Sequence, residues 1–563
     1  MRDTTHFDAI VVGSGISGGW AAKELTEQGL KTLVLEAGGP VDPNHDFVEH
    51  VQPWQMHFRG LGDRKLLEAD HPIQRECYAC DEVGHKFFVK DAENPYTNPA
   101  DAPFRWFRGR QVGGRSITWG RQVYRWSDLD FTANAKDGHG NDWPIRYSDI
   151  APWYSHVERF IGITGAREGL SQLPDGEFLP PMQMTAVEHD ARPKILKAFN
   201  NERVMTIGRA AILTKNHNGR LACHYCGPCE RGCITHSYFN SLGSTLPAAS
   251  KTGNLTLRPN SVVAEVLYDP KKSRASGVRV IDANTMESRE YTARVVFLCA
   301  STIESVRLLL NSKSARFPDG LANSSGLLGR YVMDHHYGSG AGGTVPGFTD
   351  KRTIGHRPNG IYIVRFRNVT TEHPNFLRGY GMQGGSGRGG WGRGSSMPGY
   401  GAAFKQSLID ELGPWSLSAS GWGETLPHPD NRVTLDPDVK DKWGIPAAHM
   451  DVRWRENERA MDEDMKTAMA EMLDAAGCTD IRTHGSNNPP GHCIHEMGGA
   501  RMSKTATEGV LNRWNQAWDV KNLFITDGAC MASNGCQNPS ITYMALTARA
   551  VSHAVTLTKQ NAL

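Results

Sequence analysis

Apolar and polar positions at the start of the chain follow the period of a strand, then of a helix, then of a strand again. Asp8 to Val12 form an apolar run, a helical period extends to about Glu27, and Thr32 to Leu35 form a second apolar run. Gly29 stands where the helix is expected to stop. The pattern predicts a βαβ unit with parallel strands.

The pattern of apolar and polar positions also distinguishes two kinds of segment in the rest of the chain. Residues 40–105 are polar and weakly periodic, so we expect excursions from the sheet there. Residues 336–489 consist of glycine-rich loops, tryptophans and short β-like runs, which favours a mostly antiparallel domain facing a substrate. More elements of the first domain are predicted at Leu255 to Leu257, Val262 to Tyr268, Ser276 to Ile281, Arg294 to Cys299, Asn522 to Thr526 and, as helices, from Ser301 and at Ser540 to Thr556.

Length and composition narrow the class of protein. A chain of 563 residues exceeds what one core usually serves, so we expect about two domains built from interleaved segments. With 39% hydrophobic residues, 22% charged residues and a net charge of +2, neither disorder nor binding to nucleic acid is indicated. We find no run of eighteen apolar residues, and Met1 to His6 are short and polar. We therefore expect neither a membrane span nor an export signal in the chain itself.

The first turn carries a dinucleotide-binding fingerprint. Gly13, Gly15 and Gly18, with Ser17 between them, match G-x-G-x-x-G between a predicted strand and a predicted helix. Backbone N–H groups at that helix N-terminus can bind a pyrophosphate. Glu36 ends the second strand, where an acid can bind the adenosine ribose hydroxyls. Gly385 to Gly390 fit the same pattern, but no strand precedes them, and we interpret that copy as a flexible loop.

A second constellation lies near the C-terminus. His495 to Gly499 precede a strand that ends at Asp527, and Asn538, Pro539 and Ser540 open the last helix, whose N-terminus can face a flavin ring. With the fingerprint, the Arg110 to Gly114 turn, the "ASTIESVRLLL" segment and "LGRYVMDH", the chain resembles the glucose-methanol-choline (GMC) oxidoreductases along nearly its whole length.

This resemblance implies an α/β fold and a flavin enzyme. A Rossmann-like FAD-binding domain (1–150, 195–335 and 490–563) would be interleaved with an α+β substrate domain built on an antiparallel sheet (151–194 and 336–489). His495 would be the catalytic base, Asn538 would bind the substrate hydroxyl, and a hydride would pass to flavin N5. A histidine near its ordinary pKa of roughly 6.5 suits that proton transfer. FAD contacts would come from Gly13, Gly15, Ser17, Gly18, Glu36, Arg110, Gly113, Gly114, Val263, Asp527, Asn538, Pro539 and Ser540.

Two positions depart from the family pattern. Trp119 stands where many members have an asparagine near flavin N5, which puts that contact in doubt. Thr118 stands where pyranose oxidases have a flavin-linked histidine, so we expect FAD to be bound non-covalently.

Four of the eleven cysteines form one run. Cys223, Cys226, Cys229 and Cys233 have the spacing C-x2-C-x2-C-x3-C, which is typical of an iron–sulfur cluster, on a loop at 220–236. Zinc generally binds two pairs separated by a longer stretch, and disulfides between such close neighbours would be strained. In ferredoxins the fourth cysteine of such a run binds a second cluster, so Cys233 as a ligand, and 3Fe-4S against 4Fe-4S, both stay open.

The cysteine run also bears on the reaction. Related membrane-associated fructose and glucose dehydrogenases carry a three-iron cluster and GMC oxidases lack one, so the resemblance implies a dehydrogenase whose acceptor is a cytochrome c. Cys77 and Cys80 lie in the excursion from the sheet, where we favour a structural role over a disulfide or a labile thiol pair.

Within the family, the segments "ISGGWAAKELTEQGLKTLVLEAG" and "YRWSDLDFTANAKDGHGNDWPIRYSDIAPWY" and the cysteine run resemble flavin-dependent glucoside 3-dehydrogenases, which oxidise a glycoside's C3 hydroxyl. A gluconate, fructose or polyol dehydrogenase of the same build is the alternative. A flavoprotein electron carrier without an alcohol site is another, against which His495 and Asn538 argue. Three tryptophans of the substrate domain could stack on a sugar, namely Trp391, Trp415 and Trp422.

The resemblance also implies a location. Such dehydrogenases commonly work in the periplasm, and this chain would reach it with a small partner subunit that carries the export signal. The cytoplasm is the second expectation.

Overall fold

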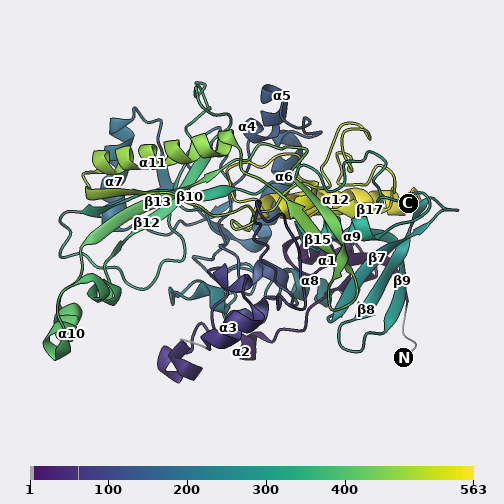
Figure 1. The fold of residues 1–563 in the computed structure, drawn as a ribbon, viewed down its shortest axis with the longest axis horizontal. Coiled ribbons are helices and arrows are strands. Elements are labelled where there is room, and N and C mark those ends of the chain that lie inside the picture. The colour runs from purple at the N-terminus through teal and green to yellow at the C-terminus, as the bar shows by residue number, and fades with distance from the viewer. Residues whose placement is uncertain (1–4, 61–62) are drawn as a thin grey trace.

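The computed structural model describes residues 5–60 and 63–563, and the ribbon divides into two lobes (Figure 1). One lobe is built on a mainly parallel sheet, the other on an antiparallel sheet. Segments of each lobe come from distant parts of the chain, as the colours of Figure 1 show. The predicted α/β class with a separate antiparallel domain is confirmed.

The parallel lobe contains the predicted βαβ unit. In the described part of the chain its sheet has the order β6-β2-β1-β9-β8-β7, and β17 also pairs with β9. β1 lies between β2 and β9, and both neighbours run parallel to it, so its apolar side chains are buried on both faces. The strands are β1 (His6–Val12), β2 (Thr32–Leu35), β6 (Leu255–Arg258), β7 (Ser261–Asp269), β8 (Arg274–Asp282), β9 (Ser288–Leu298) and β17 (Leu523–Ile525).

Helices cover both faces of this sheet. α1 (Ile16–Glu27), α8 (Thr245–Lys251) and α12 (Ser540–Lys559) share one apolar cluster with Val11 and Phe297. α9 (Thr302–Asn311) packs on the opposite face, with Val12 and Leu298. The alternation of side chains along each strand sends neighbouring residues to these two clusters.

The antiparallel lobe is a sheet with helices on one face. Its order is β16-β10-β13-β12-β11-β5 among the described residues. α11 (Glu456–Ala476) and α7 (Ala186–Ala198) pack together, and a side chain at Gly421 would collide with Met465 of α11. Glycine therefore lets the helix approach the sheet closely. The strands are β5 (Met205–Ile207), β10 (His336–Val345), β11 (Ile361–Ile363), β12 (Tyr380–Arg388), β13 (Trp415–Gly423) and β16 (Thr479–His484).

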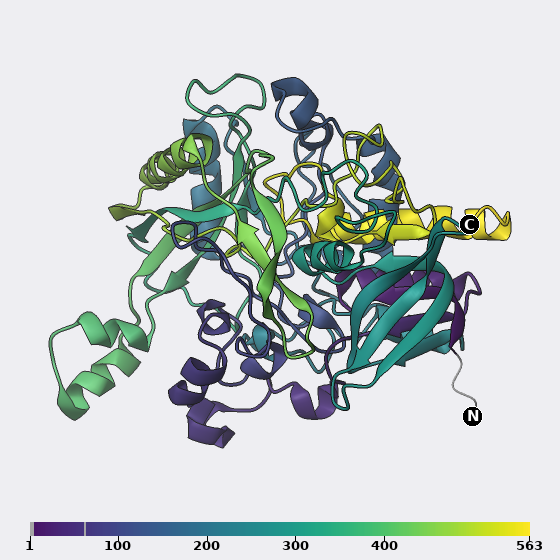
Figure 2. The ribbon, with the colours of Figure 1, turned by 45° about the vertical axis from the view of Figure 1, so that its right-hand side comes forward.

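The remaining elements lie outside the two main sheets. In residues 40–105 the described part contains only short helices and turns, as expected from its polarity. An arm around α10 projects away from the body (Figure 2). No helix among the described residues has the length and apolarity needed to cross a membrane. The other helices and strands are α2 (Pro43–Asp46), α3 (Arg64–Asp70), α4 (Asp128–Phe131), α5 (Ala133–Asp137), α6 (Tyr147–Ile161), β3 (Ile163–Thr164), β4 (Phe178–Leu179), α10 (Gly401–Asp410), β14 (Arg432–Lys440) and β15 (Pro446–Asp451).

The structure differs from the sequence-based prediction in three places. Gly385 to Arg388 belong to β12 and pair with β13, so the prediction of a flexible loop there was wrong. Glycine has a low strand propensity, but pairing with the neighbouring strand β13 holds this run in the sheet. Residues of α6 were assigned to the substrate domain, yet α6 packs on α12, where Tyr154 and Thr542 share a hydrogen bond of 2.8 Å. β5, assigned to the FAD-binding domain, is an edge strand of the antiparallel sheet.

Candidate active site

A cavity of about 600 Å³ is lined by residues of both lobes. Its volume is in the range of sites for cofactor-sized ligands. From the parallel lobe it is lined by the β1–α1 turn, residues 106–122, the start of β7 and residues 299–311. From the other side come Tyr337, Gln383, Trp422, residues 492–496 and residues 538–540. Of the predicted site residues outside the cysteine run, the cavity contacts Gly13, Gly15, Ser17, Glu36, Arg110, Gly114, Val263, His495, Asp527, Asn538, Pro539 and Ser540.

The N-terminus of α1 points its unpaired backbone N–H groups toward this cavity. Its N-cap is Gly15, whose backbone is extended and which offers no side-chain cap. A helix start without a cap leaves N–H donors free to bind an anion. Glu36 lies beside the turn, accepting hydrogen bonds from the backbone N–H and hydroxyl of Ser14 at 3.1 and 2.6 Å.

Two predicted cofactor residues shape turns instead of lining the cavity. A Cβ on Gly18 would lie 2.0 Å from the carbonyl oxygen of Gly13, so Gly18 serves close packing within the turn. Gly113 has a φ of +93° and donates its N–H to the Ser14 hydroxyl at 2.9 Å. Gly18 and Gly113 therefore shape the two glycine turns, and their contact with FAD stays a prediction.

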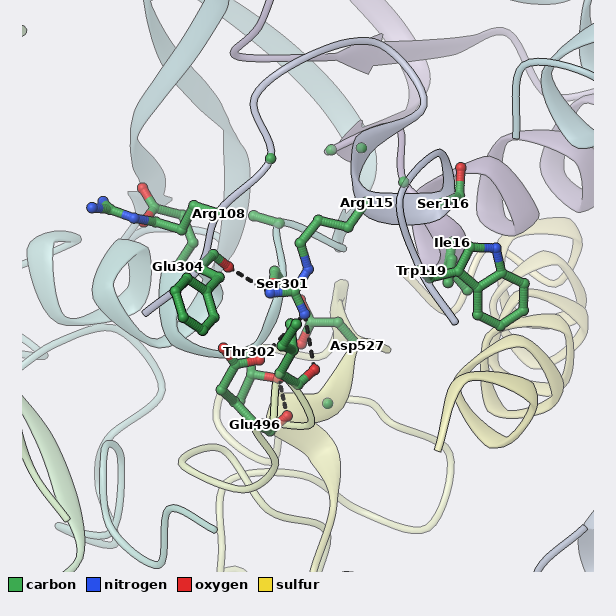
Figure 3. Close-up of a pocket in the computed structure, with 18 of the residues that line it drawn as sticks. Ile16, Arg108, Arg115, Ser116, Trp119, Ser301, Thr302, Glu304, Glu496 and Asp527 are labelled. Atoms are coloured by element: carbon green, nitrogen blue, oxygen red, sulfur yellow. Dashed lines mark hydrogen bonds and ion pairs between the residues drawn. The ribbon is translucent and has the colours of Figure 1, made fainter. Parts of the chain in front are cut away.

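Three buried polar atoms without hydrogen-bond partners belong to residues that line the cavity. In the described part of the chain, Arg110 Nη1, Glu496 Oε1 and the Tyr543 hydroxyl make no hydrogen bond although they are buried. Arg115 and Glu496 form an ion pair (Figure 3), in which Arg115 Nη2 lies 3.5 Å from Glu496 Oε2. The Thr302 hydroxyl donates to the Glu496 carbonyl at 2.6 Å. Unsatisfied buried polar groups call for a ligand. With the uncapped helix, these groups fit a dinucleotide such as FAD.

Asp527, expected to contact the flavin, also lines the cavity (Figure 3). It accepts hydrogen bonds from the Ser305 hydroxyl and, at 3.0 Å, from the backbone N–H of Ala529. Burial raises the pKa of this carboxyl to about 6.

His495 and Asn538, both predicted from sequence, meet in the cavity. Asn538 Nδ2 lies 3.4 Å from Nε2 of His495. Gln383, on β12, places its Nε2 2.7 Å from Asn538 Oδ1. The other ring nitrogen of His495, Nδ1, lies 2.9 Å from Nδ1 of His335. The residues come from four distant segments, so only the tertiary fold brings them together.

Both histidines are held neutral. Burial, followed by the charges of His335 and Arg115, lowers the pKa of His495 well below its ordinary value. Burial lowers the pKa of His335 to about 4. A neutral imidazole retains one lone pair, so His495 is available to accept a proton.

Asp334 fixes the loop that carries His495. Its carboxylate accepts backbone N–H groups of Gly491, Cys493 and His495 at 2.9, 3.2 and 3.0 Å. Three bonds from alternate loop positions hold the base relative to the strand-end segment that precedes β10. Burial, together with Glu496, raises the pKa of this carboxyl to about 8.

Aromatic rings form one side of the cavity. Tyr337 and Trp422 are cross-strand partners on β10 and β13, and their rings stack with centroids 5.5 Å apart. Tyr337 also stacks on His492, whose Nδ1 lies 2.7 Å from the tyrosine hydroxyl. Of the three tryptophans considered from sequence, only Trp422 lines the cavity. Trp415 is a core residue and Trp391 is 68% exposed near α10.

One segment lines the cavity and also contacts a residue that lines the pocket of the cysteine loop. Thr118, Trp119 and Arg121 line the cavity, and the Trp119 indole N–H donates to the Phe239 carbonyl at 2.9 Å. That indole is therefore not free to replace the missing asparagine. The Arg121 guanidinium lies 5.4 Å from the ring centroid of Tyr238. Tyr238 lines a second, separate pocket at the cysteine loop.

The cysteine loop encloses a second, small pocket. Cys223, Cys226, Cys229 and Cys233 all line it, and all four are free thiols. Four thiols around one pocket are the arrangement that the predicted cluster needs. Cys77 and Cys80 are buried and unbridged.

Sequence reasoning missed Gln383 and His335. His335 lay within the quoted "LGRYVMDH" segment, but its role depends on a contact 160 positions away. Gln383 lay beside the glycine run taken for a loop. No local pattern marks either residue.

Comparisons with known proteins agree with this geometry. The family description GMC oxidoreductase matches residues 7–336 and 427–547. The chain is 30% identical to 2-methyl-1,2-propanediol dehydrogenase of Mycolicibacterium austroafricanum, over 96% of this chain and 94% of that one. It is 26% identical to the fructose dehydrogenase large subunit of Gluconobacter japonicus, covering 98% of both. Pyridoxine 4-oxidase from "Mesorbium loti" has a similar fold, with a TM-score of 0.59 and 16% identity over 98% of this chain and 99% of that one.

Proposed function

The chain belongs to the GMC oxidoreductase family, and from that premise we propose that it is an FAD-dependent dehydrogenase of sugars or glycosides that passes electrons out through an iron–sulfur cluster. The substrate we favour is a glucoside, oxidised at C3 to the 3-keto product. The observation that carries the proposal is the pair formed by His495 Nε2 and Asn538 Nδ2, 3.4 Å apart in the cavity.

This pair suits the oxidation of a carbon-bound hydroxyl. A hydroxyl lying against both residues would accept a hydrogen bond from Asn538 and donate its proton to His495 Nε2. Removal of that proton helps a hydride leave the carbon, and a carbonyl results. Bound FAD supplies the hydride acceptor. The lowered pKa keeps His495 unprotonated.

The lining of the cavity supports a ring-shaped, hydroxylated substrate. The stacked rings of Trp422, Tyr337 and His492 offer an apolar platform, and Gln383 and Gln122 add polar groups. A sugar presents an apolar face and a polar rim. The relative named as a fructose dehydrogenase supports the sugar class, and the relative named as a propanediol dehydrogenase supports the polyol alternative.

The cysteine loop supports an outlet for single electrons. Arg121, which lines the cavity, lies against Tyr238, which lines the cysteine pocket, and the Tyr238 hydroxyl donates to the Ile117 carbonyl at 2.6 Å. The four thiols would hold the cluster. A cytochrome c is the acceptor we propose, with a small partner subunit that brings the chain to the periplasm. The fructose dehydrogenase relative is named as a large subunit, which supports the proposal of a small partner subunit.

The test is an anaerobic titration of the purified protein with methyl glucoside, followed by flavin bleaching and by electron paramagnetic resonance. We expect bleaching, a reducible cluster signal and a 3-keto product. Bleaching by gluconate, fructose or a polyol alone would keep the mechanism and change the substrate. His495→Ala should bind FAD and fail to bleach, whereas His484→Ala, at an exposed position on β16, should behave as wild type. Unimpaired bleaching in His495→Ala would refute the assigned base.

A further inference from the structure

We propose that His335 and Gln383 are positioning residues that fix the hydrogen-bond direction of the catalytic pair from its two ends. The proposal rests on the proposed function, because it deepens the role of His495 and Asn538. Five groups form one continuous chain, which runs from Gly535 through His335, His495 and Asn538 to Gln383.

One end of the chain has a fixed polarity. His335 Nε2 is hydrogen-bonded to the carbonyl oxygen of Gly535, and a carbonyl can only accept. Nε2 of His335 therefore carries a proton, and in the neutral ring Nδ1 is bare. His495 Nδ1, at 2.9 Å, must donate to it. His495 Nε2 is then left as a lone pair that faces the cavity, which is the form a general base needs.

The direction of the hydrogen bonds at the Asn538 end of the chain follows from the proton position on His335. Because His495 Nε2 is bare, the amide of Asn538 satisfies it by presenting Nδ2. The Oδ1 of Asn538 then faces Gln383, which must donate its Nε2 at 2.7 Å. An amide can be turned around only if the whole network permits it. Here a single backbone carbonyl sets the direction of every later bond, and Gln383 prevents Asn538 from rotating.

The same geometry bears on a metal site. His335, Cys493 and His495 bring three ligand atoms within 4.8 Å of one another. A metal bound to both Nδ1 atoms would leave the proton of His495 on Nε2, where it meets the donor Nδ2 of Asn538. Metal-ligating histidines need an acceptor at that second nitrogen. Burial and the nearby Asp334 also raise the pKa of the Cys493 thiol, which disfavours the thiolate. The surroundings favour a proton chain.

The first test compares two variants of His335 in the FAD-loaded protein. In His335→Asn the amide oxygen can still accept from His495 Nδ1, and in His335→Leu nothing can. A correctly placed base is worth roughly 10²- to 10⁴-fold. We expect the rate of flavin reduction to fall roughly 10²-fold or more in His335→Leu and less than about tenfold in His335→Asn, with apparent substrate Kd and flavin content little changed. Equal losses in both variants would overturn the role of His335.

The second test reverses the polarity at the far end. Gln383→Glu keeps the shape but offers only acceptors, so Asn538 would turn its Nδ2 to Glu and its Oδ1 to the bare His495 Nε2. Gln383→Ala removes the constraint without reversing it. We expect flavin reduction to be slower in Gln383→Glu than in Gln383→Ala. Gln122→Glu adds the same charge to the cavity without a contact to Asn538, and should lose less. A Gln383→Glu rate equal to or above that of Gln383→Ala would refute the proposal.

A third measurement separates this proposal from the proposed function. Nitrogen-15 NMR of histidine-labelled protein without substrate reports which ring nitrogen of His495 carries the proton, with His495→Ala used to assign the signal. We expect Nδ1–H and a bare Nε2 in the wild type, and a mixture of tautomers in His335→Leu. A proton on Nε2 in the wild type would overturn the chain. If no sugar or polyol bleaches the wild-type flavin, the proposed function fails while the NMR result stands.

Discussion

Two glycines of the same fingerprint should fail in different ways when replaced by alanine. A Cβ at Gly15 meets only Gly114 Cα, at 3.8 Å, and the backbone of Gly15, with φ −70° and ψ −150°, suits an L-residue. A Cβ at Gly18 would lie 2.0 Å from the Gly13 carbonyl oxygen and 2.7 Å from its carbon. Gly15→Ala should therefore fold normally and intrude on the cavity, whereas Gly18→Ala should strain the turn itself.

The magnitudes follow from these contacts. Overpacking of a rigid backbone costs about 1–3 kcal/mol or more, so Gly18→Ala should lower the free energy of unfolding of the apoprotein by at least about 2 kcal/mol. In Gly15→Ala the apoprotein should stay within about 0.5 kcal/mol of wild type. Loss of one hydrogen bond to a charged phosphate costs about 1.5–3 kcal/mol, which raises the Kd for FAD roughly 10- to 150-fold.

Flavin-free protein prepared by mild acid or salt treatment serves both assays, namely urea unfolding and titration with FAD followed by flavin fluorescence. Gly29→Ala is a poor control because its φ is +90°, but Gly390, which has open space, no positive φ and no place in the cavity lining, allows Gly390→Ala as a matched control. A Gly15→Ala protein that binds FAD as tightly as wild type would refute the placement of the pyrophosphate at the α1 N-terminus.

Three more outcomes are expected. Because Thr118 offers no histidine for a covalent link, acid precipitation should release all flavin into the supernatant, and yellow colour retained in the pellet would contradict non-covalent binding. The pKa of His335 is lowered from 6.5 to about 4, so the contribution of His335 to stability is constant above pH 6.5 and falls by up to about 3 kcal/mol as the pH drops from 6.5 to 4. The raised pKa values of Asp334 and Asp527 act in the opposite direction, so urea midpoints at pH 7.5 and 5 are compared between wild type and His335→Leu; a difference between the two proteins that does not change with pH would argue against a buried neutral His335. Cys226→Ser should lose iron and acid-labile sulfide but keep flavin, while Cys478→Ser, in the core beside α11, should keep both; iron retained in full by Cys226→Ser would remove that residue from the ligand set.

The sequence was sufficient for features that depend on local periodicity and close spacing. The βαβ unit and its glycine turn with Glu36 are specified within about forty residues, and the four cysteines of the loop within about eleven. Such patterns reflect constraints on the local backbone, so they can be recognised without a fold. The strands β7 and β8 were also located to within a few residues, because apolar alternation marks each strand. For β9 only the end was located, since the strand begins at Ser288 and the prediction began at Arg294.

Features that depend on long-range pairing needed the structure. The glycine run of β12 has no strand propensity of its own, and its pairing with β13 decides its conformation. The domain limits moved for the same reason, since α6 and β5 pack on elements far along the chain.

The active site shows the same division. Sequence and family resemblance named His495 and Asn538, but the direction of the proton on His495 is decided by His335 and by the carbonyl of Gly535, and the orientation of Asn538 by Gln383. These contacts join segments more than 150 positions apart in the chain. Local sequence determines which groups can exchange a proton, and the packing of the two lobes determines which nitrogen holds it.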